Sequence, residues 1–123
     1  MSSFGDEIRR ERELRRISLR EVAEATIDCF KNHVPAQVPG CVFLSGGQSD
    51  ELATAHLNEM NKIGGMPWEL SFSYGRALQA PALKAWGGKP ENLDAGQKAY
   101  YHRARCNGAA RYGKYTDAME KAA

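Results

Sequence analysis

The sequence predicts an α/β fold in which two parallel strands are flanked by helices. Strand-like apolar segments at residues 41–44 and 68–74 alternate with amphipathic, helix-like segments, and such alternation implies parallel pairing through crossover helices. Two parallel strands are too few to bury both of their faces, and they leave two open edges with unpaired backbone groups. We therefore expect an incomplete sheet.

Length, charge and cysteine content point to one modest domain without an obvious macromolecular partner. The 123 residues carry a formal net charge of +2, with both signs spread along the chain, so the charge does not demand nucleic acid or a membrane. The N-terminus is polar and no apolar run is long enough to cross a bilayer. Three scattered cysteines, Cys29, Cys41 and Cys106, favour reduced thiols. We expect a soluble, cytoplasmic protein.

Residues 1–17 are expected to form a charged N-terminal helix, separate from the segment 18–123. Ser3 and Asp6 are placed to cap it, and acids precede arginines along it, as the helix macrodipole favours. Few apolar side chains lie in this stretch, so we expect a solvated surface helix.

The strongest helix signal of the chain follows at residues 18–34. Ser18 and Glu21 form a capping-box pattern, and Pro35 ends the segment. Between them lies a stripe at amphipathic spacing, namely Leu19, Val22, Ala23, Thr26, Ile27, Phe30 and Val34.

The middle of the chain reads as strand, helix, strand. Residues 41–44 are apolar throughout and are expected to be a strand buried on both faces. Residues 49–63 predict a helix whose apolar side chains share one face. Residues 68–74 alternate between large apolar and polar side chains, which is typical of a strand with one buried face.

Two further helices are expected in the C-terminal part. The first is short, contains Pro81 in its first turn and ends at Trp86 before a glycine pair. The second is long and spans roughly residues 91–112, although Gly96 and Gly108 weaken it.

Each predicted strand is followed by a glycine loop. The first loop reads LSGGQ over residues 44–48, and the second begins SYGRALQ over residues 73–79. A strand that delivers glycines and then a helix exposes backbone N–H groups at a helix N-terminus, and an arginine is added here. Two such loops in one chain indicate a phosphate site.

These motifs carry a family resemblance. From about residue 18 to 115 the chain resembles the C-terminal part of class I fructose-1,6-bisphosphate aldolase, through FLSGGQSDELATAHLN, WELSFSYGRALQAPALKAWGGK and ARYGKY. The resemblance implies the C-terminal portion of a (β/α)₈ TIM barrel, with the two strands as its seventh and eighth. Loops after those strands recurrently form phosphate sites in such barrels.

The resemblance assigns roles to five residues. Ser45 and Gly46 match the first phosphate loop of the family, and Ser73, Gly75 and Arg76 match the second. The implied ligand is a sugar phosphate, either fructose 1,6-bisphosphate or dihydroxyacetone phosphate, held at Arg76 by a planar donor fork. From the residues alone, Arg76 could instead be a surface arginine paired with a carboxylate. Ser45 could cap the next helix, and the glycines could serve a tight turn.

The chain departs from the family at the catalytic lysine. Class I aldolases cleave fructose 1,6-bisphosphate to dihydroxyacetone phosphate and glyceraldehyde 3-phosphate through a Schiff base on a strand-borne lysine, and no lysine lies in or directly after a predicted strand here. The lysines are Lys31, Lys62, Lys84, Lys89, Lys98, Lys114 and Lys121. We therefore expect sugar-phosphate binding without Schiff-base chemistry. The alternative is an inactive truncated or chimeric chain that self-associates through its open strand edges.

Residues 4–26 also resemble the opening helices of a Cro/RodZ-like helix-turn-helix domain. The recognition helix should follow a turn, but the same apolar stripe simply continues, so DNA binding is not the favoured function. Residues 18–26 fit both resemblances, which suggests a join there. His33, His56 and His102 are isolated in sequence, so neither a metal ion nor another cofactor is expected.

Overall fold

The computed structural model describes residues 6–7, 10 and 17–122. The charged helix expected over residues 1–17 lies almost wholly outside the described residues. The elements run α2 (Leu19–His33), β1 (Gly40–Phe43), α3 (Asp50–Ile63), β2 (Glu69–Phe72), α4 (Arg76–Trp86), the 3₁₀ helix η1 (Pro90–Asn92), α5 (Leu93–Arg111) and α6 (Asp117–Lys121). Within the described part of the chain, no helix has the length and apolar character that spanning a membrane requires.

The two strands pair in parallel, as the alternation of elements predicts. Cys41 lies opposite Leu70 and Phe43 lies opposite Phe72. The pairing continues past the end of β2, because the backbone N–H of Ser73 donates to the carbonyl of Phe43 at 2.8 Å. The carboxyl ends of both strands therefore lie at the same edge of the sheet.

The expectation that the first strand is buried on both faces is wrong. Cys41 and Phe43 are half-buried against the helices, whereas Val42 between them is 65% exposed and Leu44 after them is 74% exposed. Alternate strand residues point to opposite faces, and the described helices pack on one face only. In the second strand Leu70 is buried on that same face, which confirms its predicted alternation.

Helix α2 begins and ends where the sequence indicates. The Ser18 hydroxyl accepts from the Glu21 N–H at 3.1 Å, and the Glu21 carboxylate accepts from the Ser18 N–H at 2.7 Å, which is the reciprocal capping box. The helix then runs unbroken to His33. The part of the helix-turn-helix resemblance before residue 17 lies largely outside the described residues.

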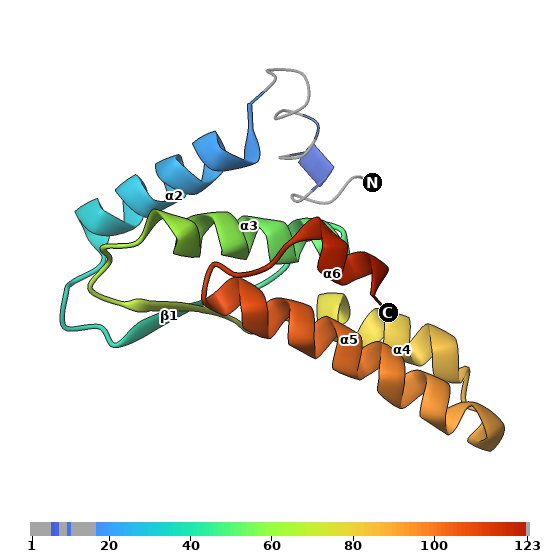
Figure 1. The fold of residues 1–123 in the computed structure, drawn as a ribbon. Coiled ribbons are helices and arrows are strands. Elements are labelled where there is room, and N and C mark those ends of the chain that lie inside the picture. The colour runs from blue at the N-terminus through green and yellow to red at the C-terminus, as the bar shows by residue number, and fades with distance from the viewer. Residues whose placement is uncertain (1–5, 8–9, 11–16, 123) are drawn as a thin grey trace.

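Three helices and the second strand build the core. α3 lies between α2 and α5 and packs on both (Figure 1), and one core cluster contains Ile27 of α2, Leu57 of α3, Ala110 of α5 and Leu70 of β2. The stripe predicted on the third helix is confirmed, since Ala53, Leu57 and Met60 are all buried. Burial of this apolar surface is the main favourable term for folding.

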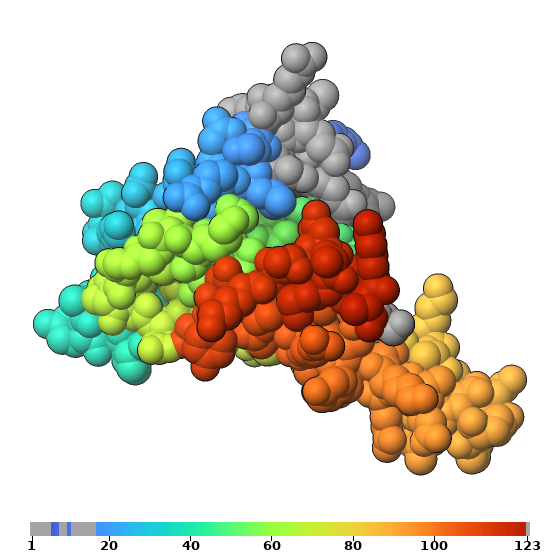
Figure 2. Space-filling model, viewed as in Figure 1, coloured from blue at the N-terminus to red at the C-terminus, as the bar shows by residue number. Residues whose placement is uncertain are grey.

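Helices α4 and α5 form an antiparallel pair that projects from the rest of the molecule (Figures 1 and 2). Gly87 ends α4 in a left-handed conformation, with φ of 59°, as the glycine pair predicts. The placement of Pro81 in the first turn is wrong, because α4 begins earlier, at Arg76. The carbonyl of Gly75 accepts from two N–H groups, those of Leu78 and Gln79, and so starts the helix there.

The glycine at position 96 lets α5 approach α4 closely. A Cβ on Gly96 would lie 2.9 Å from the Cβ of Trp86, whereas a Cβ on Gly108 would meet nothing within 4 Å. Alanine gains about 1 kcal/mol over glycine in a helix, but overpacking costs about 1–3 kcal/mol. We expect Gly96→Ala to lower the free energy of unfolding in urea, and Gly108→Ala to raise it. Equal stability of the two variants would contradict this packing.

Candidate functional site

The two glycine loops come together at the carboxyl edge of the sheet. The first loop follows β1 and leads into α3, and the second follows β2 and leads into α4. Arg76, the first residue of α4, joins them: its Nη2 lies 3.2 Å from the Ser45 hydroxyl and also donates to the carbonyl of Gln48. The structure therefore brings the predicted Ser45 and Arg76 into direct contact.

The Arg76 guanidinium also pairs with a carboxylate. Its Nη1 lies 2.9 Å from Oδ1 of Asp50, the first residue of α3. The Arg76 side chain is 48% exposed and that of Asp50 is 19% exposed. An ion pair at such exposure contributes only about 0.2–1 kcal/mol. The guanidinium thus lies at the surface between the two loops, and its ion pair with Asp50 is weak.

The first loop is a tight turn that leads into a capped helix. The N–H of Gln48 donates to the carbonyl of Ser45 at 3.1 Å, and Gly46 and Gly47 have φ of 56° and 79°, a region that favours glycine. Ser49, rather than Ser45, caps α3, because its hydroxyl accepts from the N–H of Leu52. The Ser45 side chain is buried and is left to face Arg76.

The second loop is anchored by a buried tyrosine. The Tyr74 hydroxyl donates to the carbonyl of Ala53 on α3 at 2.7 Å, and Tyr74 is only 6% exposed. Burial raises the pKa of the Tyr74 hydroxyl, so it stays a protonated donor. Gly75 then begins α4 without a side-chain cap, so the first N–H groups of that helix have no capping side chain. Ser73 and Gly75 are thereby fixed on either side of the anchor.

A buried arginine contacts α3, the helix that follows the first glycine loop. Arg103 of α5 is 3% exposed. Its Nη2 donates to the Thr54 hydroxyl at 2.5 Å and to the Asp50 carbonyl at 3.2 Å, and its Nη1 donates to the Glu120 carboxylate at 2.7 and 2.5 Å. Asp50 thus contacts Arg76 through its side chain and Arg103 through its backbone.

Glu120 ties the last helix to this arginine. Burial alone would raise the pKa of Glu120, but hydrogen bonds from Arg103 and Tyr115 outweigh burial and hold the pKa below its usual range. The Tyr115 hydroxyl donates to Oε1 of Glu120 at 2.8 Å. The carboxylate is therefore ionised and oriented, and it holds α6 against α5.

Four residues of this arrangement were not predicted from the sequence, namely Asp50, Tyr74, Arg103 and Glu120. One signal was available for the arginine: Arg103 shares a helical stripe with three residues that are all buried, namely Cys106, Asn107 and Ala110. A charged residue in a buried stripe indicates a buried partner. The short helix α6, which supplies that partner, was not predicted.

Comparison with known proteins shows which family the chain resembles. The profile described as "Fructose-bisphosphate aldolase class-I" matches residues 9–123. A "Probable fructose-bisphosphate aldolase class 1" from Xanthomonas axonopodis pv. citri is 56% identical over 99 residues, which are 80% of this chain and 30% of the relative. "Fructose-bisphosphate aldolase 2" of Caenorhabditis elegans is 59% identical over 92 residues, 74% of this chain and 25% of the relative.

A solved structure agrees with the sequence relatives. The fructose-bisphosphate aldolase of Plasmodium falciparum, in a ternary complex with TRAP and a small-molecule inhibitor, superposes with a TM-score of 0.79 at 46% identity. The match covers 80% of this chain and 28% of that one. The chain therefore spans less than a third of the length of these relatives. Its two parallel strands and surrounding helices correspond to part of an aldolase fold, and the chain belongs to the class I fructose-bisphosphate aldolase family.

Proposed function

We propose that the loops after β1 and β2 bind one phosphate group of a sugar phosphate, either fructose 1,6-bisphosphate or dihydroxyacetone phosphate. The residues that we assign to this phosphate are Ser45, Gly46, Ser73, Gly75 and Arg76. The single observation that carries the proposal is the position of Arg76, whose guanidinium reaches from the start of α4 to the Ser45 hydroxyl of the other loop. A phosphate beside this guanidinium would therefore be in reach of both loops.

The electrostatics of the edge favour an anion once Asp50 moves aside. The helices α3 and α4 both begin here, and helix N-termini carry partial positive charge. Asp50 engages one nitrogen of Arg76, but the exposed ion pair is weak. A phosphate dianion offers more acceptor oxygens to the guanidinium fork than one carboxylate oxygen does. We infer that the ligand replaces the Asp50 carboxylate on Arg76.

Replacing Arg76 by alanine should weaken dihydroxyacetone phosphate binding about tenfold or more. Hydrogen bonds to a charged group contribute about 1.5–3 kcal/mol each, and 1.4 kcal/mol corresponds to tenfold in affinity. Isothermal titration calorimetry measures this directly. Arg20 is the matched control, because its side chain is also 48% exposed and also pairs with a carboxylate, that of Glu24. Equal affinity of the Arg76→Ala and Arg20→Ala chains for dihydroxyacetone phosphate would contradict the assignment of Arg76 to the phosphate.

We infer further that this chain by itself does not form the Schiff base through which class I aldolases cleave fructose 1,6-bisphosphate. All lysines of the sequence lie within residues 17–122, and each is exposed. A nucleophilic lysine needs a lowered pKa, which a desolvated site or a nearby cation provides. An exposed position on a helix or loop is not a desolvated site. Cleavage of fructose 1,6-bisphosphate would therefore need further strands that carry the lysine.

Reductive trapping tests this inference. The protein is incubated with dihydroxyacetone phosphate and borohydride, which would reduce a Schiff base to a stable secondary amine, and the intact protein is then weighed. We expect an unchanged mass. A covalent adduct of the triose phosphate would overturn the inference, while leaving the phosphate site itself untouched.

We propose that β1 and β2 are the seventh and eighth strands of a barrel, that their open edges pair with further strands or with a second copy, and that the protein acts in the cytoplasm. DNA binding by residues 4–26 is not part of the proposal, because the aldolase profile already begins at residue 9 and α2 continues without a turn to His33.

A further inference from the structure

Three side chains of different metal-binding chemistry meet between α5 and α6. His102 and Cys106 lie one turn apart on α5, with Sγ of Cys106 3.8 Å from Nε2 of His102. Oε2 of Glu120, on α6, lies 3.2 Å from the same imidazole nitrogen. One ligand atom from each residue lies within 4.8 Å of those of the other two. We call this group the His–Cys–Glu cluster, and none of its three residues is among those assigned to the phosphate.

The spacing fits a tetrahedral zinc ion. Zinc binds imidazole nitrogen at about 2.0–2.1 Å, carboxylate oxygen at about 2.0–2.2 Å and thiolate sulfur at about 2.3 Å. In a tetrahedron these bonds separate nitrogen from sulfur by about 3.6 Å and nitrogen from oxygen by about 3.4 Å. The cluster has 3.8 and 3.2 Å for these two pairs. The third pair, Sγ of Cys106 and Oε2 of Glu120, lies within 4.8 Å, against about 3.6 Å in a tetrahedron. Side-chain adjustments that bring these two atoms closer would complete three corners of the tetrahedron.

The carboxylate of the cluster is held in place by groups outside it. Oε1 of Glu120 accepts from the Tyr115 hydroxyl at 2.8 Å and from Arg103 at 2.7 Å. Such outer partners are typical of ligating carboxylates, because they fix the orientation of the group. Arg103 also lies 2.5 Å from Oε2, so Glu120 would be shared between the ion and the guanidinium. Cys106 and His102 then supply the stronger part of the site.

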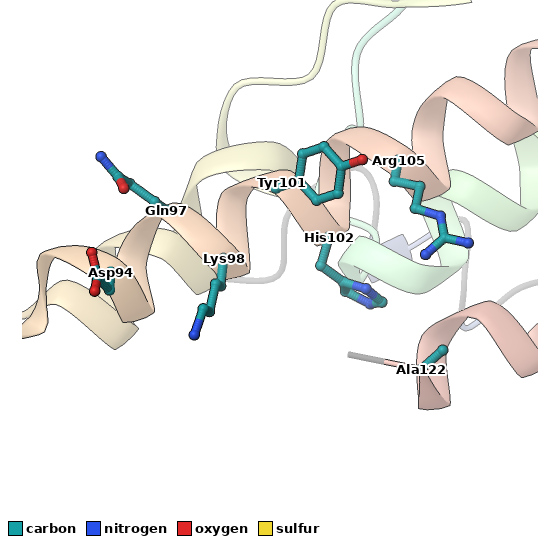
Figure 3. Close-up of a pocket in the computed structure, with 7 residues that line it drawn as sticks. All are labelled: Asp94, Gln97, Lys98, Tyr101, His102, Arg105 and Ala122. Atoms are coloured by element: carbon teal, nitrogen blue, oxygen red, sulfur yellow. The ribbon is translucent and has the colours of Figure 1, made fainter.

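A cavity borders His102, one residue of the cluster. Cys106 is 1% exposed, but the side chains of His102 and Glu120 are 18% and 19% exposed. A cavity of about 450 Å³ borders His102 and Ala122, and Figure 3 shows His102 projecting from α5 toward the end of α6 where Ala122 lies. An ion can enter from this side, and water there can occupy the fourth coordination position.

We propose that His102, Cys106 and Glu120 bind a thiophilic divalent cation, Zn²⁺, with water as the fourth ligand. A mixed nitrogen, sulfur and oxygen set in tetrahedral spacing favours zinc over magnesium or calcium. On binding, the Cys106 thiol loses its proton to the solvent and its sulfur bonds to the metal. The ion joins α6 to α5. This proposal differs from the sequence-based expectation that no metal ion is bound. Motif spacing did not reveal the ligand set, because Glu120 comes from a separate helix.

Cobalt substitution in the whole chain tests the proposal. Co²⁺ is added to the reduced protein, and thiolate-to-cobalt charge transfer is followed by absorption, with Zn²⁺ as the competitor. The variants are Cys106→Ser, His102→Gln and the double variant Cys29→Ser/His33→Gln. The double variant is the matched control, because Cys29 and His33 also lie one turn apart, with Sγ to Nδ1 at 3.8 Å. That pair is exposed, and no third ligand completes it among the described residues.

The expected result is one Co²⁺ per chain with a thiolate band that Zn²⁺ abolishes. Cys106→Ser should lose the band. His102→Gln should weaken metal binding by more than about 10–100-fold, which is the typical loss when a hydrogen-bond partner of a ligand, rather than a ligand itself, is removed. The double variant should bind the metal as the unmodified chain does. A folded chain without the band, or a band lost only in the double variant, would overturn the proposal. If circular dichroism finds Cys106→Ser unfolded, the partly exposed His102→Gln variant decides.

Discussion

Replacing Arg103 by alanine is expected to lower the free energy of unfolding by about 3–5 kcal/mol, the cost of breaking a buried ion pair by removing one partner. The side chain is 3% exposed and donates to α3 and α6 at once. Its loss leaves the Thr54 hydroxyl, the Asp50 carbonyl and the Glu120 carboxylate without their shared donor. It also leaves a cavity behind the phosphate site.

Urea denaturation of Arg103→Ala measures this effect, and Arg105→Ala is its control. Arg105 lies on the same helix two residues away but is exposed, and surface substitutions usually change stability by no more than about 0.5 kcal/mol. A loss in Arg103→Ala no larger than that in Arg105→Ala would show that the guanidinium does not hold the three helices together.

Replacing Leu57 by alanine should cost about 2–5 kcal/mol, the range measured for buried leucines. Leu57 is fully buried in the middle of α3, within the core cluster that also contains Ile27 of α2, Leu70 of β2 and Ala110 of α5. Because α3 packs against all of these elements, the sheet and helices are not free to collapse into the space that the side chain leaves.

Thermal or urea unfolding followed by circular dichroism measures the Leu57→Ala effect. Leu83→Ala is the matched substitution on the surface, since Leu83 is 58% exposed on α4, and it should change stability far less. Comparable losses in the two variants would mean that the core does not form between α2, α3 and α5. Because the first glycine loop leads into α3, the Leu57→Ala chain should bind sugar phosphate only under conditions in which it remains folded.

Local features of the chain were predictable because their causes lie within a few residues. The capping box of Ser18 and Glu21 and the glycine end at Gly87 each depend on neighbours in the sequence. The parallel pairing of the strands followed from the alternation of elements. The convergence of Ser45 and Arg76 followed in turn, since loops after parallel strands lie at one edge.

Other features depend on contacts between distant residues. The exposure of Val42 reflects how many elements cover β1, which the apolar run at 41–44 cannot specify. The Thr54 hydroxyl donates to the Asn107 side chain at 2.6 Å, and Arg103 meets Glu120, although neither pair is close in sequence. No local pattern marks such a pair before the fold is known. The His–Cys–Glu cluster was not predicted for the same reason.

The most direct test of the phosphate site is a titration of the ¹⁵N-labelled chain with dihydroxyacetone phosphate, followed by two-dimensional NMR. The proposal predicts that amide shifts concentrate in the two loops, at Gly46, Gly47, Gly75 and Arg76, and that the Arg76→Ala chain no longer shows them. Shifts that are absent, or that concentrate elsewhere, such as the exposed end of the α4–α5 pair, would contradict it.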